Sequence, residues 1–412
     1  MTQPAPPSVS LRPLFSLPVI VAALGYFVDV YDLLLFNIVR VPSLQELGLS
    51  NTDVSLIGGR ILNFQQAGLL LGGILWGILG DKRGRLSVLF GSILTYSLAN
   101  IACGFVHDPT LYSVLRFVAG FGLAGELGAG ITLVNEILPK ELRAYGSSLV
   151  ASVGLFGAVV AYFTVTLYTW RTTYFIGGSL GLGLLLLRVS IFESGMFTRV
   201  QQTATSRGNF WSLFSPRERL MRYVYCMGIS LPTYLVIGLL ATFGNEFAQA
   251  MGLEAAVPPG RCVMFTYIGI VVGDLLSGIF SQYLRSRRQA IGLMMGLTLV
   301  FVGVYLSGIL KTTDAFYAIC MGMGFGIGYI AMFLTITAES FGTNLRSTAT
   351  TSVANNVRAT TLISIPAFQA MKPLIGVLGA GAVVSAVCFA VGFWSLTQLD
   401  ETFGKDLDYV EL

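Results

Sequence analysis

The sequence predicts an all-α membrane protein in which twelve transmembrane helices form two pseudo-symmetric six-helix bundles. Three observations lead to this prediction: the composition, a series of long apolar stretches, and motifs that recur halfway along the chain. Of the 412 residues, 54% are hydrophobic and 11% are charged, whereas soluble domains carry about 25% charged residues. A soluble chain of this length has too little polar surface to cover so much apolar material. We therefore expect lipid as the surrounding solvent.

The apolar stretches give the elements in order, because a helix needs about 20 mostly apolar residues to cross a bilayer. Residues 1–192 are expected to form the first bundle, with spans near 14–40, 54–79, 87–106, 111–138, 146–168 and 173–192. Residues 222–398 are expected to form the second, with spans near 222–249, 261–283, 290–310, 315–338, 347–371 and 374–398. The polar, basic segment 193–221 is a predicted cytoplasmic linker, and 399–412 is a predicted soluble tail.

Basic residues indicate the orientation of these spans. Most of the 25 lysines and arginines fall at one side of the predicted bundle, including Arg83, Arg143, Arg217 and Arg288. Cytoplasmic loops of membrane proteins carry such an excess. Both termini are therefore expected in the cytoplasm, and we expect a monomer embedded in a bacterial cytoplasmic (inner) membrane.

An internal repeat indicates that the two bundles are duplicates. The run Gly77-Ile-Leu-Gly-Asp81 has a counterpart 201 residues later, Gly278-Ile-Phe-Ser-Gln282, in which glutamine replaces the aspartate. Arg85 then aligns with Arg287, at an offset of 202. Two further pairs are each seven residues apart and separated by an offset of 203, Glu136 with Arg143 and Glu339 with Arg346. A parallel duplication of this kind is one way in which transporter folds are built.

Three segments of the first half resemble the motifs of a known family. Segment 77–85, Gly-Ile-Leu-Gly-Asp-Lys-Arg-Gly-Arg, resembles the signature loop of the major facilitator superfamily. Segment 116–126 resembles its fourth-span motif, most closely that of the metabolite–proton symporter and sugar-porter branches, and segment 136–143 is similar to their charged turn. The resemblance implies the major facilitator fold and solute transport by alternating access of the two halves, without enzymatic activity.

The resemblance also implies a cytoplasmic gate. A latch that holds this gate shut would use residues of both halves: Gly77, Asp81, Arg85, Glu136, Arg143, Glu339 and Arg346. The alternative is that the basic residues among them only set the topology.

Charged residues inside the first bundle point to proton coupling. A charge at mid-membrane costs about 2.5–3.5 kcal/mol on insertion scales, so such residues are functional candidates. Asp29 and Asp32 are three residues apart and share a helix face, and Glu126 lies at similar depth. Arg116 is expected about 15 Å outward of Glu126, within reach of Asp32. We expect these four residues to couple transport to protons; a permanent structural ion pair is the alternative.

Arg358 is the one basic residue predicted near the middle of a span in the second bundle. Its planar guanidinium suits a carboxylate, which favours a substrate anchor for an organic acid or amino acid. The alternative is a pair with Asp274 of the eighth span. Other polar side chains at mid-depth are candidates for substrate contact or, equally, for bonds between helices: Tyr26, Tyr31, Asn37, Asn63, Gln65, Gln66, Tyr234, Tyr329, Asn355 and Asn356.

Together these features predict proton symport of a small polar organic solute, driven by the proton gradient and without a cofactor. An uncoupled facilitator or exporter, metal or siderophore uptake, and a transporter-like receptor are the alternatives. No phosphate-binding loop for ATP is present in the sequence, and the five cysteines lack metal-ligand spacing. We expect no metal site and no nucleic-acid partner.

Overall fold

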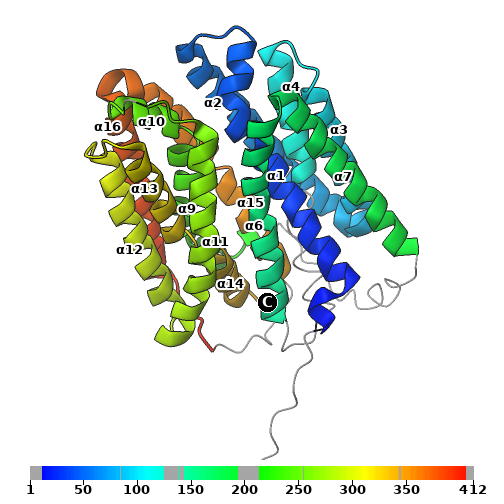
Figure 1. The fold of residues 1–412 in the computed structure, drawn as a ribbon. Helices are drawn as coiled ribbons and strands as arrows, with labels where there is room; N and C mark the ends of the chain where they lie inside the picture. Colours follow the sequence, from blue (N-terminus) through cyan, green and yellow to red (C-terminus); the bar gives the residue numbers. More distant parts are fainter. Residues whose placement is uncertain are drawn as a thin grey trace, which may run out of the picture.

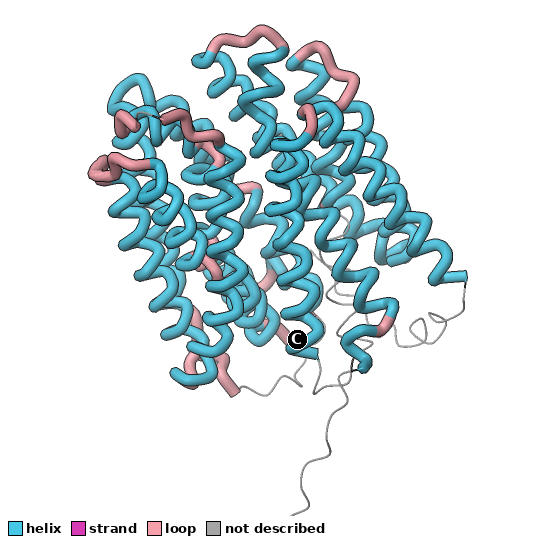
Figure 2. Tube along the Cα trace, viewed as in Figure 1, coloured by secondary structure: helices cyan, strands magenta, loops and turns pink. Residues whose placement is uncertain are grey.

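The structure, a computed structural model, describes residues 12–83, 85–124, 138, 143–193, 213–253, 255–342 and 345–404. Helices and the loops that join them make up the whole of this described part (Figure 2). The helices run roughly along one direction and form two groups, one from each half of the sequence (Figure 1). This arrangement confirms the predicted all-α fold.

The first half begins with a short 3-10 helix, η1 (Arg12–Phe15), and continues with long helices. These are α1 (Leu17–Glu46), α2 (Asn51–Arg83), α3 (Arg85–Cys103), α4 (Pro109–Leu123), α6 (Arg143–Leu167) and α7 (Trp170–Glu193). Local sequence explains where α4 starts: Asp108 caps it by accepting a hydrogen bond from the main-chain N–H of Leu111, and Pro109 follows at the first helical position.

The described part of the second half is divided into more elements. Its elements are α8 (Arg217–Gly228), α9 (Leu231–Leu235), the π-helix η4 (Val236–Ala241), α10 (Gly244–Ala250), α11 (Pro259–Leu284), α12 (Arg287–Leu306), α13 (Thr313–Gly326), α14 (Ile330–Ser340), α15 (Arg346–Arg358) and α16 (Thr361–Gln398). Helix occurs in each of the twelve predicted spans. Among the described residues, six helical stretches are long and apolar enough to cross a membrane by themselves, or seven with the bent pair α8–α9.

Several spans that the sequence predicts as continuous are broken. The chain bends by 41° between α8 and the α9–η4 segment, where Pro232 lacks a main-chain N–H for the helix. Span 315–338 divides into α13 and α14, and span 347–371 divides between α15 and α16. Gly376, with a left-handed φ of 74° that glycine adopts without strain, interrupts α16 close to the predicted boundary between the last two spans. In transporters, broken helices typically supply main-chain polar groups to the solute site.

The two halves repeat the same close helix contact. A Cβ on Gly68 or Gly72 of α2 would overlap main-chain atoms of α4, and a Cβ on Gly269 or Gly273 of α11 would overlap those of α13. Each glycine of the second pair lies 201 residues after its counterpart in the first. Small residues let membrane helices approach this closely, so the duplication extends to the packing.

Candidate functional site

Arg358 lies at the end of α15, at the break before α16, and only 7% of it is exposed. Its Nε donates a hydrogen bond of 3.2 Å to the hydroxyl of Tyr234, whose ring centroid lies 5.9 Å from the guanidinium carbon. Its Nη1 is buried and has no hydrogen-bond partner among the residues that the structure describes. Tyr26 of α1 and Tyr267 of α11 lie within electrostatic range of the charge. Arg358 therefore lies among tyrosines of both halves, and its Nη1 is available to donate a hydrogen bond to a solute.

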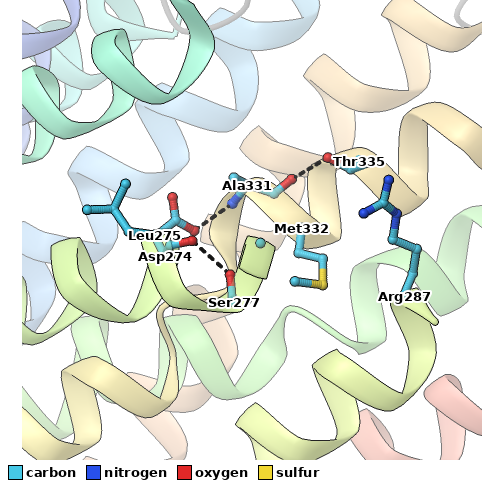
Figure 3. Close-up of a pocket in the computed structure, with 8 residues that line it drawn as sticks. Asp274, Leu275, Ser277, Arg287, Ala331, Met332 and Thr335 are labelled. Carbon is cyan, nitrogen blue, oxygen red and sulfur yellow. Dashed lines mark hydrogen bonds between the residues drawn. The ribbon is translucent and has the colours of Figure 1, made fainter. Parts of the chain in front are cut away.

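Asp274 does not pair with Arg358, which was the alternative to a substrate anchor. Its Oδ1 instead accepts a hydrogen bond of 2.9 Å from the main-chain N–H of Ala331, in the first turn of α14 (Figure 3). An acidic side chain in this position stabilises the start of a helix. Asp274 also lines a cavity of about 140 Å³ between α11 and α14, which extends to Thr335 and Arg287. Its carboxylate thus supports the break between α13 and α14.

Further buried polar atoms without a hydrogen-bond partner occur on α2 and on α15. Asn63 Oδ1, Gln66 Oε1 and Asn355 Oδ1 are buried and lack a hydrogen-bond partner within the described part of the chain. The Asn355 amide lies beside Gly73 of α2, 3.6 Å from where a Cβ would be placed. Buried polar atoms usually have a hydrogen-bond partner. Buried polar atoms without one, on helices of both halves, are expected where a solute binds and supplies the missing partner.

The two aspartates of α1 are buried, and Asp32 is beside Arg116. Arg116 donates through Nη2 to the main-chain oxygen of Asp32 at 3.2 Å, through Nη1 to Asn100 Oδ1 at 2.8 Å and through Nε to Gln65 Oε1 at 3.3 Å. The Asp32 carboxylate lies within electrostatic range of the guanidinium. Tyr174 of α7 adds an aromatic face 5.6 Å from it. Helices α1, α2, α3 and α7 together hold this buried cation in one position.

The Asp32 carboxylate itself lies against α7. A Cβ on Gly177 would overlap Asp32 Oδ1, so glycine makes the room that the carboxylate occupies. Asp29 lies one turn away on the same helix, toward Tyr26. The first half therefore places one aspartate by Arg116 and the other toward the Arg358 site.

Four other predicted contact residues take part in packing within one half. The Tyr31 hydroxyl contacts Thr164 Oγ1 at 2.9 Å and the main-chain oxygen of Thr173 at 3.2 Å. Gln65 donates to the main-chain oxygen of Leu33 and accepts from Arg116. The Tyr329 hydroxyl donates to the main-chain oxygen of Ile229 at 3.0 Å. The Asn356 amide donates to the Tyr223 hydroxyl at 2.9 Å. These contacts match the alternative of bonds between helices.

The predicted cytoplasmic gate is described only in its second-half part. Glu136 of the gate and the proton-coupling candidate Glu126 lie outside the described residues. Gly77, Asp81, Arg85 and Arg143 lie in described helices, but their surroundings are outside the description. Glu339 forms an ion pair with Arg287 at 3.2 Å. Arg346 donates through Nε to the main-chain oxygens of Ala338 and Phe341 at the end of α14. Arg85 and Arg287, which align in the internal repeat, are the first residues of α3 and α12.

The tail that follows α16 is attached to this cluster. Glu401 accepts hydrogen bonds from the Ser286 hydroxyl and from the main-chain N–H groups of Arg287 and Arg288, at the start of α12. Burial alone would raise the pKa of Glu401, but these hydrogen bonds lower it below its usual range. Thr402 donates to Glu339 at 2.6 Å. The tail thus joins the ends of α12, α14 and α16.

Comparison with known proteins identifies the family. The family model described as "Major Facilitator Superfamily" matches residues 22–365. The chain belongs to this superfamily. It is 24% identical over 399 residues to the "Probable 4-methylmuconolactone transporter" of Cupriavidus pinatubonensis, covering 94% of this chain and 90% of the relative. It is also 24% identical to the "Benzoate transport protein" of Acinetobacter baylyi, covering 80% of this chain and 78% of that one.

A solved structure shares the fold. The crystal structure of a D-xylose–proton symporter superposes with a TM-score of 0.67 at 15% sequence identity, covering 94% of this chain and 99% of that one. The superfamily and these relatives are transporters and not enzymes. The protein is an integral membrane transporter of small molecules, as the sequence predicts.

Proposed function

We propose that this transporter is a symporter that carries a small organic acid together with a proton. The observation that supports this most directly is Arg358, a buried cation whose Nη1 has no hydrogen-bond partner among the described residues. A buried donor without a partner costs about 1–3 kcal/mol, and more when charged. A carboxylate of the solute would use that donor and neutralise the charge.

The surroundings of Arg358 favour a small acid. Tyr26, Tyr234 and Tyr267 offer aromatic faces and hydroxyl groups around the guanidinium, and Asn355 offers an unused amide oxygen nearby. The names of two relatives, for benzoate and for a methylmuconolactone, are consistent with a compact solute that carries an acidic or carbonyl group. We therefore favour organic acids over sugars and amines as substrates.

Charge balance supplies the reason for a proton. A solute carboxylate would neutralise Arg358, and it would also bring a second negative charge toward Asp29, which lies one turn from Asp32 in the direction of Tyr26. Two negative charges close together in a closed, poorly hydrated site are costly. Protonation of Asp29 removes that cost, and the loaded carrier then changes its access with one proton per carboxylate.

We infer that access alternates through rocking of the two halves around the Arg358 site, with both termini in the cytoplasm. The duplicated packing of α2–α4 and α11–α13 supports two rigid halves. Broken helices α8–α9, α13–α14 and α15–α16 supply points where the second half can bend.

Uptake into proteoliposomes tests this proposal. We expect benzoate or another organic acid to accumulate when the outside is more acidic, after subtraction of uptake by protein-free liposomes. A proton ionophore should abolish the accumulation. Saturable entry that stops at equal concentrations on both sides and does not respond to the pH gradient or the ionophore would show an uncoupled facilitator. An absence of saturable uptake for every organic acid would overturn the substrate class.

A further inference from the structure

A polar network joins the two halves at the end of the bundle predicted to face outside. Arg40, near the end of α1, is fully buried. It donates to three groups of the second half: the main-chain oxygen of Thr242 at 3.1 Å, Asn245 Oδ1 at 3.1 Å and Glu246 Oε1 at 3.4 Å. Every one of these bonds connects the first half to the second.

Glu246, on α10, lies between two cations that come from different halves. Its Oε1 pairs with Arg40 and its Oε2 with Lys372 of α16 at 2.5 Å. Lys372 also donates to Ser55 Oγ of α2 at 2.8 Å. Loss of the Glu246 charge would leave two partly or fully buried cations near each other, and burying an uncompensated charge is unfavourable.

Neighbouring contacts close the same region. Asn37 donates to Thr242 Oγ1 at 2.8 Å, and the Gln369 amide donates to the main-chain oxygen of Ser55 at 3.2 Å. Gly59 of α2 allows Ile365 of α16 to approach, with 3.2 Å from the Ile365 methyl carbon to the position of a Cβ. Polar bonds and apolar packing together leave the halves in contact at this end.

We propose that Glu246 is the central residue of an outer gate, and that its ion pairs with Arg40 and Lys372 hold this end of the transporter closed. The described arrangement is then the outer-closed state, and solute entry from that side requires these bonds to break. This inference assigns a gate and does not depend on which solute is carried or whether a proton accompanies it.

The test measures gate opening without any substrate. Ile365→Cys places a reporter at a buried position across the gate from Gly59, in a chain whose five native cysteines are replaced by serine or alanine. The purified protein is treated with a maleimide dye. We expect Glu246→Gln to raise the labelling rate about tenfold, the change that corresponds to about 1.4 kcal/mol.

The matched control is Glu46→Gln. Glu46 pairs with Arg171 at 3.1 Å on the same end of the bundle, but both residues belong to the first half and are more exposed. This variant should label at the parental rate. If Glu246→Gln does not yield a folded, monodisperse protein, Lys372→Gln, which removes one of the two pairs, replaces it and should also label faster.

Labelling of the Glu246 variant, or of its replacement, at the rate of the Glu46 control would overturn the proposal. So would equal acceleration by both, because that would indicate general loosening of this end. Failure of the proton-coupled uptake proposed above leaves the labelling result unaffected, so the two can be told apart.

Discussion

Replacing Arg358 by glutamine removes the guanidinium while keeping a polar side chain at the break between α15 and α16. In the empty protein, the replacement loses the hydrogen bond to Tyr234, worth about 1.5–3 kcal/mol for a charged donor. It also removes a buried charge whose Nη1 has no partner in the described part of the chain. These effects oppose each other, so we expect a small change in thermal stability.

The effect on solute binding is larger, because no opposing effect offsets the loss of the hydrogen bond between the guanidinium and the solute. A carboxylate that accepts from the guanidinium gains a charged hydrogen bond of about 1.5–3 kcal/mol. At 1.4 kcal/mol per tenfold, Arg358→Gln should weaken the binding of an organic acid about 10- to 100-fold. Tyr234→Phe keeps the charge and loses one neutral hydroxyl, so it should weaken binding less than tenfold.

Ligand-dependent thermal stabilisation measures both quantities on the same samples. Benzoate and other organic acids are titrated against the parent and the two variants, and uptake into proteoliposomes gives the corresponding KM. Equal affinity of the parent and Arg358→Gln for every acid that binds would refute the role of Arg358 as the anchor. A much larger loss for Tyr234→Phe than for Arg358→Gln would refute the ranking of the two groups.

Two further predictions concern a carboxylate in each half. Gly177→Ala should displace the Asp32 carboxylate, because a Cβ would overlap Oδ1, and should reduce pH-driven uptake with a destabilisation of about 1–3 kcal/mol. Gly183→Ala on the same helix has nothing within 4 Å of the new methyl group and is the control, so equal uptake by the two variants would contradict the prediction. The pKa of Glu401 is lowered in the folded protein, so its stabilising effect is present above the usual glutamate pKa of about 4.3 and is lost as the pH falls through the lowered value. The thermal stability of the parent should exceed that of Glu401→Gln at pH 7, and the difference should narrow toward about pH 3; a difference that stays constant would be inconsistent with the titration of Glu401.

The spans were predictable because the bilayer imposes a length and an apolar composition on every helix that crosses it. The breaks within them were not predicted. A hydropathy window averages over Pro232, over Gly328 between α13 and α14, and over residues 359–360 between α15 and α16. These interruptions change the composition of a span very little. Pro232 was the strongest available signal, since proline removes a helix hydrogen bond.

The buried charges were also found from sequence. Asp29, Asp32, Arg116 and Arg358 stand out because a charge within an apolar span is costly, and all four are buried in the structure. The sequence left open whether Arg358 pairs with Asp274. The structure answers this, because the carboxylate of Asp274 caps α14.

Uncharged polar residues were harder to assign. Tyr31 and Gln65 were candidates for solute contact, yet both bond inside the first half. Depth in a span can be read from sequence, but the direction of a side chain depends on how each helix is rotated about its axis. Asn100, which holds Arg116, and Tyr267, which lies near Arg358, gave no distinct signal because amides and tyrosines are common in helix packing.

Counterflow and accumulation by Asp29→Asn test the coupling proposal most directly. Asparagine resembles the protonated aspartate, so the loaded carrier should still change its access without a proton. The proposal predicts that Asp29→Asn exchanges labelled for unlabelled organic acid across proteoliposomes nearly as fast as the parent, but does not accumulate the acid when a pH gradient is imposed. Accumulation at the parental level would contradict the proposal. So would the loss of both exchange and accumulation in a variant that still binds the acid.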